Sequence, residues 1–308
     1  MVSIVGIKGS IKATSALEVG FKRHGDVYKL VDYPQDATGA DCFIQTNLLK
    51  PKFYKQRERA SAYQFILDSN KPFLVSESPV FRKHPEWTRL GWYSYKWTEG
   101  VFGNENSSSD RWDKFEKQSG ITFKDWNSPG DHILIMGQKE GDSSLSEMYK
   151  DYESFYEWVE KIVHDIRKYS DRKIIVRPHP RNLGHGVGMC EKLNKRGKLN
   201  IEISSNLTEG GTQGGEGLDR DLQNAYCVIT YNSLSAVEAI CEGIPTFAFD
   251  NGSMIWPVAH KDISQIENLN YDVDLTQWKY DVAYTQWNRK ENKTGESWAH
   301  LKPLMFKE

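Results

Sequence analysis

The sequence of 308 residues predicts an α/β protein with two Rossmann-like domains that face a cleft, followed by a helical tail. Short apolar runs alternate with amphipathic segments in both halves, and a long irregular stretch separates the two series. The length suits two domains of about 130 to 170 residues, each able to bury its own core. We predict an N-terminal domain over residues 1–128 and a C-terminal, ligand-binding domain with the tail over residues 129–308.

The first half alternates strands and helices as a parallel sheet covered by helices does. Ala16, Leu17 and Phe21 share one helical face, and an apolar run precedes them. The predicted strands are residues 2–6, 27–31, 41–45 and 72–76, and the predicted helices are residues 13–23 and 53–69.

Residues 79–129 interrupt this alternation and are rich in Trp, Tyr, Gly, Asn and Ser. A stretch of this length without a regular pattern is typical of a functional loop or a domain connector. It contains GNENSSSDRW (103–112), which we expect to cap a short helix at Asp110. The turn sequence NSPGD (127–131) marks the domain boundary.

A second alternation fills the other half. The predicted strands are residues 132–136, 173–177, 200–204, 226–231 and 244–249. The predicted helices are residues 145–169, 187–196, 219–225 and 233–241, with a glycine-rich loop at 210–217 and a Trp-rich helical tail at 264–301.

The composition predicts a cytoplasmic globular protein. No apolar run approaches the roughly 20 residues that span a bilayer, and the N-terminal residues lack the apolar centre of a signal peptide. The four cysteines form no CxxC pair, so we expect free thiols and no metal site. The net charge of −2 excludes the overall positive field of a strongly DNA-binding domain, so contact with a polyanion would need a local basic patch.

Three polar loops follow predicted strands of the second half. The first lies in HILIMGQKEGDSSL (132–145), where an apolar strand leads to Gly137, Gln138, Asp142, Ser143 and Ser144. Backbone N–H groups at the helix start that follows would bind phosphate. An ordinary helix cap at Asp142 or Ser143 explains these residues equally well.

The second loop lies in IIVRPHPR (174–181). The strand carries Arg177 and His179 to the carboxyl edge of the sheet, where α/β proteins bind ligands. Two prolines stiffen the turn, and Arg and His both donate hydrogen bonds to phosphate. The alternative is structural, with Arg177 in an ion pair and His179 capping the loop.

The third loop lies in CVITYNSLSAVEAICEGIPTFAF (227–249). Asn232 and Ser233 form the turn, and Ser235 lies where a helix start would face a diphosphate or a ribose. Glu238, one turn later, could accept hydrogen bonds from ribose hydroxyls. Ser235 and Glu238 also have the spacing of a capping box.

Together, GQKEGDSS (137–144), RPHPR (177–181) and NSLSAVEAICEGIP (232–245) resemble the glycosyltransferases of capsule-polysaccharide synthesis. These enzymes are similar in plan to GT-B enzymes that transfer sialic acid and KDO. The resemblance covers the second half and implies a UDP- or CMP-type nucleotide sugar as co-substrate, with no further cofactor. It implies Gln138, Asp142 and Ser143 near this donor, Arg177 and His179 on its phosphates, and Ser233, Ser235 and Glu238 around the helix start and nucleoside.

Transfer to a hydroxyl with inversion needs a base, which we expect in the first half. Glu77 in FLVSESPVF (73–81) directly follows the fourth strand, and the resemblance puts an acidic residue at a similar place. A carboxylate that caps the Ser78–Pro79 turn is the competing interpretation. His84 and Asp110 are the alternative bases.

FRKHPEWTRLGWYSY (81–95) with SSSDRW (107–112) resembles phage-encoded relatives, some similar to enzymes that glycosylate hydroxymethylated pyrimidines of DNA. LLKPKFYKQRER (48–59) adds a basic, aromatic segment, and phosphate contacts and base stacking use those residue types. A solvated helix start explains the same segment equally well. The expected acceptor is therefore double-stranded phage DNA in the host cytoplasm, contacted by Lys50, Lys52, Lys55, Arg57 and Arg82. A capsule or lipopolysaccharide glycosyltransferase and a nucleotide-sugar epimerase remain the alternatives.

Overall fold

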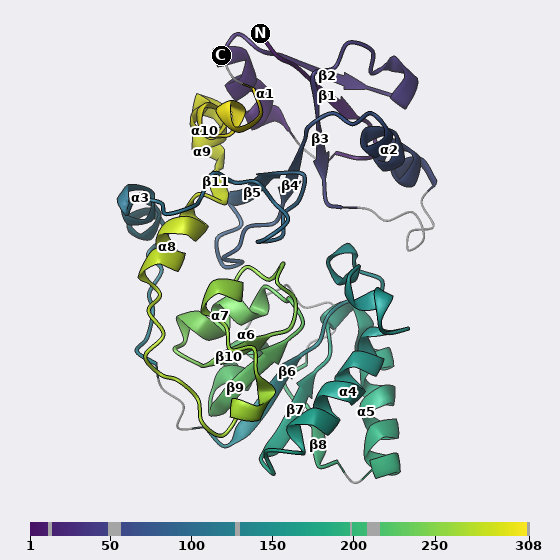
Figure 1. Ribbon diagram of the computed structural model, residues 1–308, viewed down its shortest axis with the longest axis vertical. Helices are drawn as coiled ribbons and strands as arrows, with labels where there is room; N and C mark the ends of the chain where they lie inside the picture. The colour runs from purple at the N-terminus through teal and green to yellow at the C-terminus, as the bar shows by residue number, and fades with distance from the viewer. Residues whose placement is uncertain (12–13, 49–56, 127–129, 198, 208–215, 307–308) are drawn as a thin grey trace. The chain divides into compact units, whose positions relative to one another are not determined.

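The computed structural model describes residues 1–11, 14–48, 57–126, 130–197, 199–207 and 216–306, and the chain forms two compact α/β units (Figure 1). The first unit comprises Met1–Val80, His84–Ser119 and Thr276–Glu308, and the second comprises Phe81–Lys83 and Gly120–Leu275. Each unit is a sheet with helices on both faces, which confirms the predicted fold class.

The second unit is built on a parallel sheet of five strands in the order β10-β9-β6-β7-β8. The strands are β6 (His132–Met136), β7 (Lys173–Arg177), β8 (Ile201–Ile203), β9 (Ala225–Thr230) and β10 (Thr246–Ala248). Ile133 and Ile135 of β6 pack into a core with α4 (Phe155–Ile166) and α5 (Leu183–Gly197). Leu134 and Met136 point to the other face, toward α6 (Glu216–Leu222) and α7 (Ser235–Cys241). A strand that is covered on both faces is mostly apolar, as β6 is from Ile133 to Met136.

The first unit has a mixed sheet of six strands in the order β11-β5-β4-β3-β1-β2. Four strands are parallel: β1 (Ser3–Ile7), β2 (Val27–Val31), β3 (Cys42–Thr46) and β4 (Phe73–Glu77). The other two, β5 (Trp87–Trp92) and β11 (Gln286–Asn288), run antiparallel to their neighbours. Helices α1 (Ser15–Arg23) and α10 (Glu296–Met305) cover one face, and α2 (Arg57–Asp68) covers the other.

The C-terminal tail belongs to the first unit, which differs from the predicted division at residues 128 and 129. The tail contains α8 (Thr276–Ala283), β11, α9 (Arg289–Thr294) and α10, so it is not helical throughout. Its strand extends the first sheet, and Trp298 and Leu301 of α10 are buried in that sheet's core. The pairing of β11 with β5 joins segments far apart in the sequence, which local patterns do not reveal.

Two further expectations were wrong in their local detail. The irregular stretch contains β5, whose Gly91 is required because a Cβ there would lie 2.3 Å from Cε1 of Phe102. The predicted helix over residues 145–169 is shorter: α4 begins at Phe155, because the Ser154 hydroxyl accepts a hydrogen bond from the Glu157 N–H. In the parts of the chain that the structure describes, no helix combines the length and apolar character needed to cross a membrane.

A buried ion pair fastens the tail to the rest of the first unit. Nη1 and Nη2 of Arg111, on α3 (Asp110–Ser119), lie 3.0 and 3.1 Å from the carboxylate oxygens of Glu291 on α9. The Arg111 guanidinium also lies over the Trp287 ring, 3.6 Å from its centroid. Burial alone would raise the pKa of Glu291, but hydrogen bonds and the charge of Arg111 outweigh it and lower this pKa. The pair therefore contributes stability above the ordinary carboxyl pKa of 4.5, and this contribution is lost as the pH falls through the lowered pKa.

We expect Glu291→Gln to lower the free energy of unfolding of the first unit by about 3 kcal/mol or more, because it leaves the Arg111 charge buried without its partner. Urea unfolding followed by tryptophan fluorescence measures the change. The control is Glu18→Gln, which breaks an exposed pair with Lys22 and should cost less than about 0.5 kcal/mol. Equal effects of the two substitutions would contradict a stabilising role for the buried pair.

Candidate functional site

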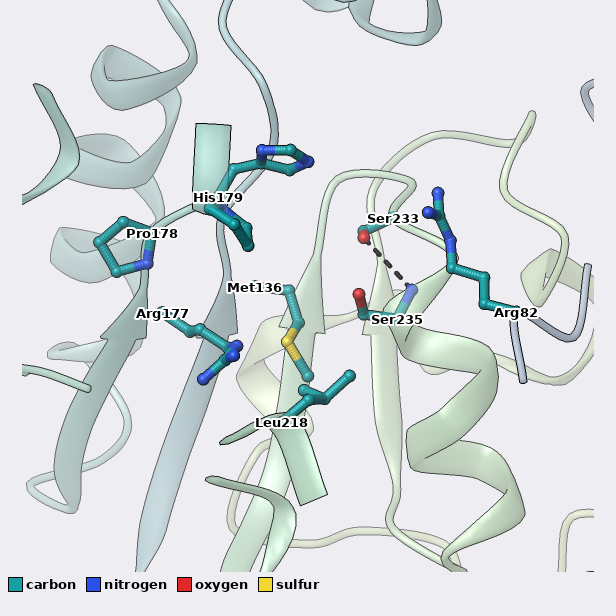
Figure 2. A pocket seen from close by; sticks show the side chains of 10 residues that line it. Arg82, Met136, Arg177, Pro178, His179, Leu218, Ser233 and Ser235 are labelled. Carbon is teal, nitrogen blue, oxygen red and sulfur yellow. Dashed lines mark hydrogen bonds between the residues drawn. The ribbon is translucent and has the colours of Figure 1, made fainter. Parts of the chain in front are cut away.

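A pocket lies within the second unit, at the carboxyl edge of its sheet (Figure 2). From β6 the chain continues to β7 and β8 on one side of the sheet, and it then returns to β9 and β10 on the other side. The crevice where the strand order reverses is the usual ligand site of such sheets. The pocket is partly open to solvent and is lined by Arg82, Met136, Gly137, Arg177, Pro178, His179, Pro180, Leu218, Ser233 and Ser235.

Five of the predicted donor-binding residues line this pocket together. They are Gly137, Arg177, His179, Ser233 and Ser235. Gly137 is needed for close packing, because a Cβ there would lie 2.5 Å from the backbone oxygen of Arg177. Its N–H donates to that same oxygen at 2.7 Å, which fixes the loop after β6 against the turn after β7.

Arg177 is held in a buried ion pair, as the structural alternative predicted. Its Nη1 donates to the Asp221 carboxylate of α6 and to the Gly217 backbone oxygen, the latter at 3.1 Å. Asp221 is 4% exposed and also accepts hydrogen bonds from Ser204 and Asn206. The charge of Arg177 is thus largely neutralised within the unit. Asp221 was missed because nothing in the sequence marks its pairing with a residue 44 positions away.

His179 presents a neutral imidazole. Its Nδ1 accepts a hydrogen bond from the Arg181 backbone N–H at 3.1 Å, so the ring proton of the neutral form is on Nε2. Burial lowers the pKa of His179 to about 4, with a smaller contribution from the charges of Arg181 and Arg82. The side chain therefore supplies a hydrogen-bond donor without a charge.

Gln138 and Asn232 do not line the pocket, and they form a hydrogen-bonded pair of side chains beside it. Nε2 of Gln138 donates to Oδ1 of Asn232 at 2.6 Å, and Oε1 of Gln138 accepts the Asn232 backbone N–H at 2.9 Å. Nδ2 of Asn232 donates to the Ser144 backbone oxygen and to the Asp250 carboxylate. These contacts use both amides to join the loops after β6 and β9.

Asp142, Ser143 and Ser144 also lie outside the pocket lining. The Asp142 carboxylate caps a short 3₁₀ helix by accepting the Ser144 N–H at 3.0 Å, which is the structural alternative stated above. Ser143 is buried within that helix.

Ser233 and Ser235 come from the turn between β9 and α7. The Ser235 N–H donates to the Ser233 hydroxyl oxygen at 3.3 Å, drawn as a dashed line in Figure 2. The capping box between Ser235 and Glu238 does not form, because the cap position is Leu234 and no side chain bonds there. Glu238 is 7% exposed, and neither carboxylate oxygen has a hydrogen-bond partner among the described residues. Burial raises the pKa of Glu238, and the positive charge of Lys83 offsets part of this rise.

Arg82 lines this pocket, although we predicted it on an acceptor-binding face. Lys50, Lys52 and Lys55 of that predicted face lie outside the described residues. Arg57 begins α2, and the structure does not describe its side chain. Of the predicted basic face, Arg57 therefore belongs to the first unit and Arg82 to the second.

The candidate bases belong to the first unit. Glu77 ends β4, opposite Arg89 of β5, and its Oε1 accepts hydrogen bonds from the Ser78 N–H and hydroxyl at 2.7 and 2.8 Å. This is the turn cap that competed with the catalytic interpretation. His84 packs edge-on against Phe115, and Asp110 begins α3 and accepts from the Ser108 hydroxyl at 3.1 Å.

Known structures share this architecture across both units. KpsC from Thermosulfurimonas dismutans, a β-Kdo 2,7-transferase, has 13% identity and a TM-score of 0.52 over 96% of this chain and 98% of its own. A KpsC β-Kdo 2,4-transferase from the same organism has 14% identity and a TM-score of 0.52 over 92% of this chain and 91% of its own. This chain has the GT-B fold.

Sequence comparisons add nothing to this likeness, since no protein-family profile and no curated protein matches the chain. The UDP-GlcNAc 2-epimerase of Methanocaldococcus jannaschii is 9% identical over 95% of this chain and 97% of its own. Its TM-score of 0.38 is too low to argue from.

We expect His179 to stay neutral from pH 8 down to pH 5, because its pKa is about 4. Imidazole ¹⁵N chemical shifts measure this, with His179→Asn to assign the signal. Since the folded-state pKa lies below the ordinary value of 6.5, the unfolded chain binds the proton more readily, and stability falls as the pH drops from about 6.5 toward 4. A His179 signal that titrates near pH 6.5 would contradict the neutral tautomer.

Proposed function

We propose that this protein is a glycosyltransferase that binds a nucleotide sugar in the pocket of the second unit and transfers the sugar to a hydroxyl of a carbohydrate acceptor. One observation carries the proposal: the pocket at the strand-order reversal gathers the His179 ring, two serine side chains and arginine side chains. Neutral hydrogen-bond donors and guanidinium groups are the partners that phosphate oxygens require. The GT-B fold supports this proposal, because a two-unit enzyme can bind donor and acceptor separately.

The roles within this donor site follow from the hydrogen bonds described above. His179 would donate from Nε2 to a phosphate oxygen, and the Ser233 and Ser235 hydroxyls would donate to the same group. Gln138 and Asn232 would hold the loops in position, since their side-chain amides are bonded to protein partners. Arg177 would hold its loop through Nη1, which is paired with the Asp221 carboxylate. Glu238 would accept hydrogen bonds from the nucleoside, because its buried carboxylate has no described partner.

A carbohydrate acceptor is a better proposal than DNA. Arg82, one of the five residues expected to contact DNA, lines the pocket that we assign to the donor. The side chains of the other four are not described, so no described contact favours a nucleic acid. The two KpsC structures are Kdo transferases, and this supports the capsule-type alternative of the sequence analysis.

The first test is a transfer assay with CMP-, UDP- and GDP-activated sugars, Kdo among them, and three acceptor conditions. These are Kdo- or GlcNAc-terminated oligosaccharides, duplex DNA with 5-hydroxymethylcytosine, and no acceptor. We expect the mass of an oligosaccharide to increase by one sugar residue. A nucleoside heavier by one sugar would show that DNA is the acceptor and would contradict the carbohydrate acceptor. Conversion of the donor without any acceptor would favour an epimerase. If the protein binds none of these activated sugars, the proposal is overturned.

Glu77 is the base that we propose for the acceptor hydroxyl, because it ends a central strand of the other unit. Glu77→Gln should lower turnover by roughly 100-fold or more and leave the donor dissociation constant unchanged. Glu116→Gln, an exposed glutamate on α3 of the same unit, is the matched control and should change neither quantity. Turnover that survives Glu77→Gln would remove this residue from the role.

A further inference from the structure

Three residues from the N-terminal half of the sequence pack with the second unit. We call this segment, Phe81–Lys83, the strap. The residues on either side, Val80 and His84, belong to the first unit. Phe81 is 3% exposed and packs edge-on against Phe123, with ring centroids 6.5 Å apart. Lys83 pairs with Asp219 of α6 at 3.0 Å, so both ends of the strap are fixed to the second unit.

Arg82, the middle residue of the strap, reaches the pocket. Figure 2 shows it on the side where Ser233 and Ser235 lie, across from Pro178 and His179. Its charge contributes to lowering the pKa of His179, after burial and the charge of Arg181, which agrees with this placement at the pocket wall. Since Phe81 packs against Phe123 and Lys83 pairs with Asp219, contacts within the protein hold the backbone of Arg82 beside the pocket.

The other polar groups that line the pocket supply little net positive charge, and Arg82 adds a positive charge there. The guanidinium of Arg177 is paired with the Asp221 carboxylate, and His179 donates a hydrogen bond without a positive charge. Ser233 and Ser235 are neutral. A phosphate that entered this pocket would be taken out of water, and it would need an opposite charge to offset the lost hydration.

We propose that Arg82 is a phosphate-binding residue of the nucleotide donor site, with its planar guanidinium gripping phosphate oxygens between the His179 ring and the two serines. This inference rests on the proposed function for the identity of the nucleotide. A guanidinium matches two phosphate oxygens at once, which a lysine ammonium does not. The donor site would therefore combine the loops of the second unit with a residue that precedes the whole of its sheet in the sequence.

The test compares nucleotides with their nucleosides. Isothermal titration calorimetry measures the dissociation constants of CMP, UDP, cytidine and uridine for the full chain and its variants. Arg82→Gln should weaken binding of the nucleotide by about tenfold or more, as expected for a lost charge-assisted hydrogen bond, and change nucleoside binding by less than about threefold. The nucleotide affinity of Arg82→Lys should lie between those of the wild type and Arg82→Gln, because lysine keeps the charge but cannot bond two phosphate oxygens as the planar guanidinium does.

Arg181→Gln is the matched control. Arg181 is exposed, lies two residues after His179 and does not line the pocket, so its loss should weaken nucleotide binding by less than about threefold. Nucleotide affinity unchanged in Arg82→Gln would overturn the proposal. An equal loss of nucleoside and nucleotide binding would also overturn it, because Arg82 would then shape the site rather than bind phosphate.

The same measurements separate this inference from the proposed function. A wild-type protein that binds nucleotides through Arg82 but transfers no sugar would refute the transferase and support the phosphate role. If the wild type binds no nucleotide, titration with inorganic pyrophosphate decides the question. Binding that Arg82→Gln weakens would support an anion site, and absence of binding would overturn both proposals.

Discussion

The pocket depends on one constraint, which is that β6 has neighbours on both edges and helices on both faces. Its side chains alternate between two cores, so a shift of the strand by one residue would move each apolar side chain out of the core that it packs into and toward the opposite one. The chain then leaves β6 toward one edge of the sheet and returns on the other. The loops after β6, β7 and β9 therefore emerge beside each other at a point that the rest of the unit holds rigid.

Much of the polar chemistry around this point serves to hold loops together. The Gln138–Asn232 pair joins two loops, and the Arg177–Asp221 pair attaches the third to α6. A buried amide or guanidinium that has lost its water needs such partners, and each unmet hydrogen bond costs about 1–3 kcal/mol. Several residues of types that could bind a ligand thus form hydrogen bonds and ion pairs within the protein. The groups that remain for a ligand are fewer than the sequence suggests.

The sequence predicted the bounds of strands best where an apolar run is continuous. The bounds of β6 and β7 match the prediction because HILIM and KIIVR are continuous apolar runs apart from their ends, as strands covered on both faces require. It failed where long-range pairing decides the structure. β5 contains Gly91 and the buried Arg89, which do not resemble a strand, and β11 is short and pairs with a segment about 200 residues earlier. The place of Arg82 was missed for the same reason, since the chain on both sides of the strap, up to Val80 and from His84, belongs to the other unit.

The return of the tail to the first unit gives the two units different histories during synthesis. Apart from the strap, the second unit is one continuous stretch of chain, so its sheet can form as soon as that stretch has left the ribosome. The first unit lacks β11 and the Trp298 side chain of α10 until residues 276–306 have been made. Its core can therefore close around Trp298 only after the sequence of the second unit has been made. The order of translation therefore makes the first unit the later of the two to have all of its core residues, although β1 precedes every strand of the second unit.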